Sequence, residues 1–131
     1  MRQTNRLGIL MLSFGICIAG CTTAKKILPL HDEVLRFNLP YDLTYLRAAE
    51  ALQRVAGWEL ESTEKEKGII LVRNINYSSF DDADKRIATV LIKHIGARET
   101  SVQLAPESQR ILGGGTLLEN ISRIMDQELN K

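Results

Sequence analysis

Five short stretches, most of which alternate apolar and polar residues, constrain the fold of this chain more than any other feature. A period of two is typical of a β-strand that buries one face and exposes the other. Pro40 and Pro106 end the first and last stretch, because proline cannot donate a hydrogen bond to a strand ladder. The expected strands span residues 33–39, 58–62, 69–72, 86–94 and 100–105.

Two amphipathic helices are expected between and after these strands. Asp42 can cap a helix that continues through Ala56, where a glycine follows. The glycines at 113–115 break the chain, and Thr116 and Glu119 have the capping-box spacing that opens a second helix. Each helix has one apolar stripe. The stripes consist of Tyr45, Ala48, Ala49, Leu52, Val55 and Ala56, and of Leu117, Leu118, Ile121, Ile124, Met125 and Leu129.

The element order is therefore β-α-β-β-β-β-α, with no internal repeat. Short connections such as the hairpin loop at 64–67 favour an antiparallel sheet. A sheet with one face in water needs its other face covered, and two amphipathic helices suffice for this. The prediction is a single α+β domain over residues 33–131, in which a five-stranded antiparallel sheet carries two helices on one face.

The first twenty residues have the organisation of a secretory signal peptide. Arg2 and Arg6 form a positive segment, an apolar segment follows from Leu7 to Ile18, and the small residues 19–20 precede Cys21. The apolar stretch is shorter than the ~20 residues that a transmembrane helix needs. We therefore expect residues 1–20 to be removed rather than to span the membrane.

The sequence Ile18-Ala19-Gly20-Cys21 resembles a bacterial lipobox. That resemblance implies that the Cys21 thiol receives a diacylglyceryl group and that its new amino group is acylated, for example with palmitate. The membrane is then a partner through the acyl chains on Cys21, and residues 21–32 form a short tether. Thr22 stands where lipoproteins retained in the inner membrane of many diderm bacteria carry aspartate. The expected location is therefore the outer membrane, facing the periplasm.

Composition excludes two classes of chemistry. Cleavage would remove Arg2 and Arg6 and no acid, which leaves 15 basic and 16 acidic residues from the chain's 17 and 16. This balance lacks the basic surface that nucleic-acid binding requires. Cys17 leaves with the signal peptide and Cys21 is acylated, so no cysteine remains for a disulfide, a metal or a nucleophile.

Other motifs point to ordinary structure rather than to catalysis. The three glycines before Thr116 lack the lysine and spacing of a P-loop, and we expect a flexible hinge there. The acidic cluster Asp81, Asp82 and Asp84 lacks the glycine and glutamate of a calcium loop. His31 and His94 are the only imidazoles, and no serine lies in a nucleophile elbow. We predict no catalytic residue, metal or cofactor, and hence no enzyme.

Protein contact is the function that remains. The open sheet edge can accept a partner strand, and the loop from Tyr77 to Asp84 can carry recognition. Tyr77 and Phe80 either anchor a partner or pack under the sheet edge. We predict a non-catalytic interaction or scaffolding module with an envelope protein as partner. The alternative is a lipid or small-molecule carrier that uses a groove between helix and sheet.

The whole pattern is similar to small bacterial lipoproteins that carry a domain of unknown function. The resemblance covers residues 35–129 and rests on the lipobox and on the pattern Tyr41-Asp42, Ala48-Ala49, Leu52, Gly57, Gly68, Arg98–Val102 and the glycines before the last helix. The element order is also similar to the helix-grip modules of a lipoprotein component of the outer-membrane β-barrel assembly machine. These resemblances imply an architecture and no activity.

Overall fold

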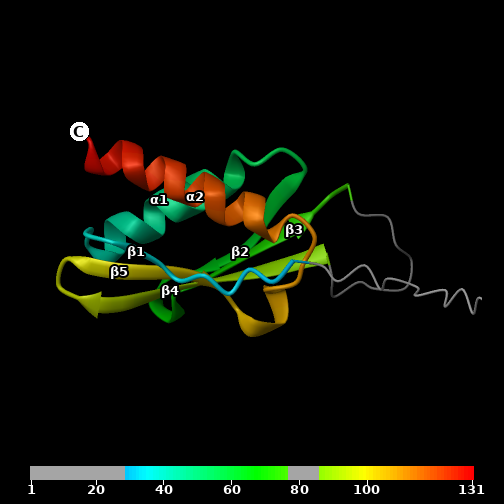
Figure 1. Cartoon of the computed structure of the whole chain (residues 1–131), viewed down its shortest axis with the longest axis horizontal. Helices are drawn as coiled ribbons and strands as arrows, with labels where there is room; N and C mark the ends of the chain where they lie inside the picture. Colours follow the sequence, from blue (N-terminus) through cyan, green and yellow to red (C-terminus); the bar gives the residue numbers. More distant parts are fainter. Residues whose placement is uncertain (1–28, 77–85) are drawn as a thin grey trace, which may run out of the picture.

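The computed structural model describes residues 29–76 and 86–131 and shows a two-layer α+β fold (Figure 1). The predicted fold class and element order are confirmed. The strands form one antiparallel sheet in the order β1-β5-β4-β3-β2. The elements are β1 (Leu35–Phe37), α1 (Tyr41–Gln53), β2 (Trp58–Glu64), the short 3-10 helix η1 (Lys65–Lys67), β3 (Ile69–Asn74), β4 (Ile87–Gly96), β5 (Glu99–Leu104), the 3-10 helix η3 (Pro106–Ser108) and α2 (Gly114–Leu129).

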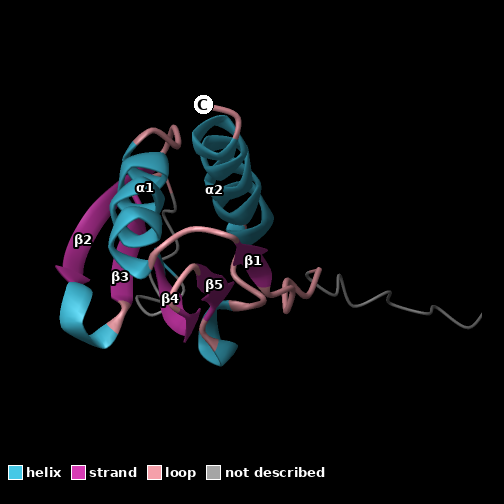
Figure 2. Cartoon of the chain, turned by 90° about the vertical axis from the view of Figure 1, so that its left-hand side faces the viewer, coloured by secondary structure: helices cyan, strands magenta, loops and turns pink. Residues whose placement is uncertain are grey.

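The two helices lie antiparallel to each other on the same face of the sheet (Figures 1 and 2). Helix α1 packs over β2 and β4, and α2 packs over β1 and β5. The first described residues lie at the end of the sheet where β3 ends and β4 begins. The β4–β5 hairpin and the C-terminus lie at the opposite end (Figure 1).

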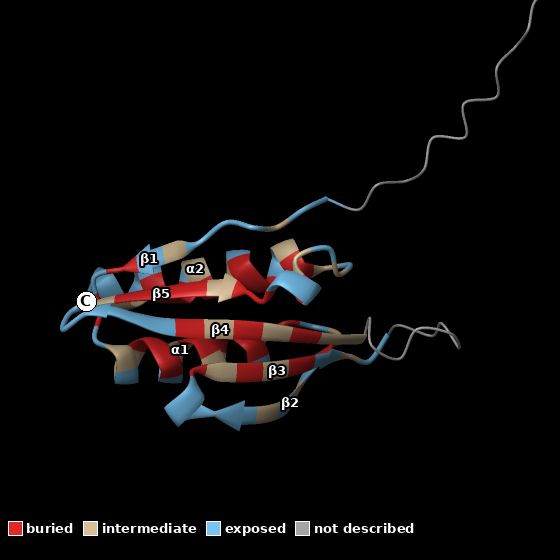
Figure 3. Ribbon diagram, turned by 90° about the horizontal axis from the view of Figure 1, so that it is seen from below, coloured by how far each residue is buried: buried red, intermediate tan, exposed pale blue. Residues whose placement is uncertain are grey.

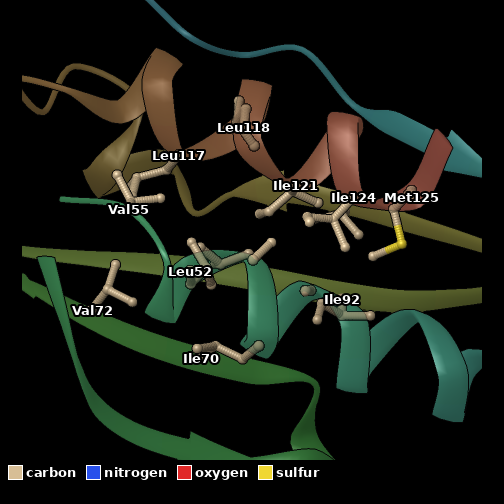
Figure 4. Packing of buried hydrophobic residues seen from close by; sticks show 14 of the residues in the cluster. Leu52, Val55, Ile70, Val72, Ile92, Leu117, Leu118, Ile121, Ile124 and Met125 are labelled. Carbon is tan, nitrogen blue, oxygen red and sulfur yellow. The ribbon is translucent and has the colours of Figure 1, made fainter. Parts of the chain in front are cut away.

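Burial alternates along strand β4, although most of residues 87–92 are apolar. Ala88, Val90 and Ile92 are buried against the helices, and the residues between them are half-buried on the other face. Figure 3 shows this alternation from below. The inward residues join one core with the apolar stripes of both helices (Figure 4). The stripes are confirmed except at Ala49, which is half-buried, and at Ala56 and Leu129, which are exposed.

The predicted helix boundaries are wrong at three ends. Helix α1 begins at Tyr41 after Pro40, so Asp42 lies in its first turn and is not the cap. It ends at Gln53, because the backbone N–H groups of the next two residues donate to carbonyls three residues back and tighten the chain into a turn. Helix α2 begins at Gly114, so Thr116 lies inside the helix and forms no capping box.

Two strands also differ from the prediction in length. Only residues 35–37 of the first stretch pair with β5, so β1 is shorter than expected. Strand β2 continues to Glu64, beyond the predicted end at residue 62. The connection to β3 therefore consists only of η1 and Gly68. A β-bulge between Leu60 and Ser62 shifts the register of β2 against β3 and leaves Glu61 without a partner residue.

An ion-pair network joins the two helices. The Arg47 guanidinium lies 2.7 Å from Glu50 on α1 and 2.9 Å from Glu128 on α2. The hydrogen bond from Arg47 holds the pKa of Glu50 below its usual range. The hydrogen bond from Lys131, with Arg47 as a further cause, does the same for the pKa of Glu128.

We expect this network to make the fold sensitive to acid. Both carboxylates have lowered pKa values in the folded state, so their stabilisation is complete above the unfolded pKa of about 4.3 and is lost as the pH falls through the folded values. Urea unfolding between pH 7 and pH 3 measures this. The double variant Glu50→Gln/Glu128→Gln should lose less stability over this range than the unchanged protein, and an equal loss would contradict the prediction.

Candidate functional site

Several predicted positions lie outside the described residues. They are Cys21 and the whole loop segment Tyr77, Phe80, Asp81, Asp82 and Asp84. The acylation of Cys21 and the role of that loop therefore stay predictions. The structure places His31, His94, the glycines before α2 and both edges of the sheet.

His94 lies near the end of β4, as expected, and stacks on an aromatic ring. The ring centroids of His94 and Tyr41 are 4.2 Å apart, and the Tyr41 hydroxyl donates a hydrogen bond to the carbonyl of Lys65. Burial raises the pKa of Tyr41. Asp42 pairs with Lys65 at 2.9 Å, and the hydrogen bond from Lys65 lowers the pKa of Asp42. These contacts fasten the start of α1 to η1 and β4.

The glycines before α2 pack closely, which the hinge prediction did not anticipate. Gly113 has a positive φ of 84°, and a side chain there would meet the Trp58 ring at 3.2 Å. An added Cβ at Gly115 would lie 2.5 Å from the His31 imidazole. The backbone N–H of His31 donates a hydrogen bond to the backbone carbonyl of Gln109 at 2.8 Å. The glycine run therefore makes room for Trp58 and His31.

A groove between α1 and the edge strand β2 has a mainly apolar lining. Its volume is about 660 Å³. Leu46 is 60% exposed, and Leu43, Ala49 and Leu60 are half-buried. The full lining is Asp42, Leu43, Tyr45, Leu46, Ala49, Gln53, Leu60, Thr63 and Lys65.

The predicted stripe of α1 contains Ala49 but neither Leu43 nor Leu46, so the sequence prediction missed most of this second apolar face. Leu43, Leu46 and Ala49 recur at intervals of three, which places them on one side of the helix. They lie beside the main stripe that enters the core. This spacing was the signal that could have found the groove.

Strand β2 forms the wall of the groove opposite α1 and is one edge of the sheet. An edge strand leaves backbone N–H and C=O groups unpaired on its outer side. Its exposed side chains are mainly acidic. Arg73 of β3 lies 3.4 Å from Glu59 and 3.5 Å from Glu61, and Lys67 lies 2.7 Å from Glu64. The guanidinium of Arg73 is therefore shared by the carboxylates of Glu59 and Glu61.

Within residues 29–76 and 86–131, no three His, Cys, Asp or Glu side chains are grouped so that they could hold a metal ion. None of the helices in these ranges has the length and hydropathy needed to cross a membrane.

No protein-family model and no curated protein sequence matches this chain. The similarity to small bacterial lipoproteins and to the helix-grip modules therefore stays a prediction, and the open edge with its groove is the site that the geometry offers.

Proposed function

We propose that the protein is a membrane-anchored, non-catalytic interaction module of the bacterial cell envelope. Acyl chains on Cys21 hold it at the membrane, with the outer membrane and the periplasmic side as the expected location. The open β2 edge beside the apolar groove is the observation that supports protein contact most strongly. Such edges bind extended segments of other proteins through backbone hydrogen bonds.

The carrier alternative has weaker support. The space between the helices and the sheet is filled by buried side chains such as Leu52, Ile121 and Met125, each no more than 2% exposed (Figure 4). The groove of about 660 Å³ beside β2 opens at the surface. Carrier sites bury most of the ligand surface. A contact surface for a protein therefore suits this groove better than an enclosed ligand site.

Acylation of Cys21 gives a direct test of the anchor. Cells that express the protein are fed a palmitate analogue carrying an alkyne, and the purified protein is assayed for the label. We expect labelling of the unchanged protein and none of Cys21→Ala, because the thiol and the cleavage site are lost. Cys17→Ala is the matched control and should keep the label. Labelled Cys21→Ala protein would contradict the proposed anchor.

A native mass spectrum of the full-length protein, extracted from its own membranes in mild detergent, tests the module itself. A mass beginning at acylated Cys21 together with a stoichiometric protein partner supports the proposal. A reproducible small-molecule adduct without a protein partner supports the carrier instead. A chain that still begins at Met1 contradicts the anchor.

A further inference from the structure

We infer that β2 and the groove beside it bind an extended segment of a partner protein that alternates apolar and cationic side chains. The segment joins the sheet as an additional strand next to β2. This inference rests on the proposed interaction function and specifies the chemistry of the partner.

The first argument concerns the backbone. Strand β2 spans seven residues and, among residues 29–76 and 86–131, pairs with β3 alone. The opposite edge of the sheet, β1, spans three residues. Main-chain hydrogen bonds supply affinity when a strand is added to a sheet edge. Strand β2 therefore offers the longer of the two edges for such pairing.

The second argument concerns the face toward the helices. Alternate side chains of an added strand point toward the α1 layer. There they meet Leu43, Leu46 and Ala49 of α1 and Leu60 of β2, which leave apolar surface exposed in the groove. Leu46 alone is 60% exposed. Apolar residues at every second position of the partner would cover this surface and gain free energy from its burial.

The third argument concerns the face of β2 that points away from the helices, where charged side chains determine which partner residues fit. Residues 58–67 contain four glutamates and two lysines. Glu59 and Glu61 share Arg73, so negative charge exceeds positive charge along this edge. Opposite charges on neighbouring strands stabilise pairing and like charges oppose it. Lysine or arginine at the remaining positions of the partner complements the glutamates.

A second copy of this chain fits the edge poorly. Antiparallel pairing of β2 with itself over its full length places Glu61 opposite Glu61 of the other copy. The occupant is therefore a different polypeptide with cationic side chains.

The test uses the full-length protein in non-ionic detergent and two synthetic nine-residue peptides. One peptide alternates valine with lysine, and the other alternates valine with glutamate. Hydrogen exchange followed by mass spectrometry reports the protection of each backbone segment. We expect the lysine peptide to slow exchange in residues 58–64 and the glutamate peptide to leave it unchanged.

Three variants separate the apolar and charged contributions. Leu46→Asn should weaken binding of the lysine peptide about tenfold, because the partner loses apolar contact. Leu112→Asn is the matched control, since Leu112 is 58% exposed and lies outside the groove, and it should bind as the unchanged protein does. Glu59→Gln/Glu61→Gln should weaken binding about fivefold at low salt.

Several outcomes would overturn the inference. They are equal protection by both peptides, no binding of the lysine peptide at millimolar concentration, protection of other segments without protection of 58–64, and a dimer that protects β2 without peptide. An acylated Cys21 with a protein partner would leave the proposed function intact in each of these cases. Conversely, protection of β2 by the lysine peptide in a chain that lacks acylation would retain the docking site and reject the anchor.

Discussion

Replacement of Gly68 by alanine is expected to lower the free energy of unfolding by about 3–5 kcal/mol. Gly68 has a φ of +68°, a conformation that residues with a side chain rarely adopt. An added Cβ would also overlap the carbonyl oxygen of Ile92 on β4. The Ile92 N–H donates to the Gly68 carbonyl at 2.7 Å, so relief of the overlap would break this hydrogen bond.

Gly96→Ala provides the matched control for this prediction. Gly96 ends β4 and has no positive φ, and apart from its two chain neighbours no heavy atom of the described residues lies within 4 Å of the position that a Cβ would take. We expect a change within about 0.5 kcal/mol. Urea unfolding of both full-length variants, followed by circular dichroism in mild detergent, measures the difference. Equal stability of the two variants would show that the close approach at Gly68 is not required.

Replacement of Leu52 by alanine is expected to cost about 2–5 kcal/mol. Leu52 is fully buried in the last turn of α1 and points into the space between α2 and the sheet (Figure 4). Truncation removes apolar contacts and leaves a cavity, because the surrounding helices and strands relax only in part. The midpoint of urea unfolding should fall, with little change in the dependence on urea concentration.

Leu46→Ala is the control on the same helix. Leu46 differs from Leu52 in lying on the outer side of α1, where it is 60% exposed. Its truncation should change the free energy of unfolding by about 0.5 kcal/mol or less. A loss at Leu46 as large as that at Leu52 would mean that the groove residues stabilise the fold as core residues do.

The order of the elements and the buried faces could be predicted because both follow from local periodicity. The inward residues Ala88, Val90 and Ile92 and the apolar stripe that includes Leu52 repeat over several pleats or turns, so an error in one residue does not change the prediction. The end of α1 depends instead on two backbone hydrogen bonds after Gln53. No side-chain pattern in that segment predicts them.

The candidate site was harder to predict because it depends on which strands lie at the edges. The hairpin signals predict that β2 pairs with β3, but they do not place β5 between β1 and β4. That arrangement is a long-range property of the fold, and it leaves β2 with a free side. The groove then follows from Leu43 and Leu46, which lie outside the stripe that predicted the core.

The short length of chain between Cys21 and the folded domain has a consequence for binding strength. Eight peptide units separate Cys21 from Pro29, which span at most about 26–29 Å when fully extended. An acylated Cys21 would therefore confine the β2 edge to a thin layer beside the bilayer. A partner held in the same membrane would meet it at a higher effective concentration than the same partner free in solution. Under that confinement, a weaker intrinsic affinity gives the same occupancy as a stronger one in solution.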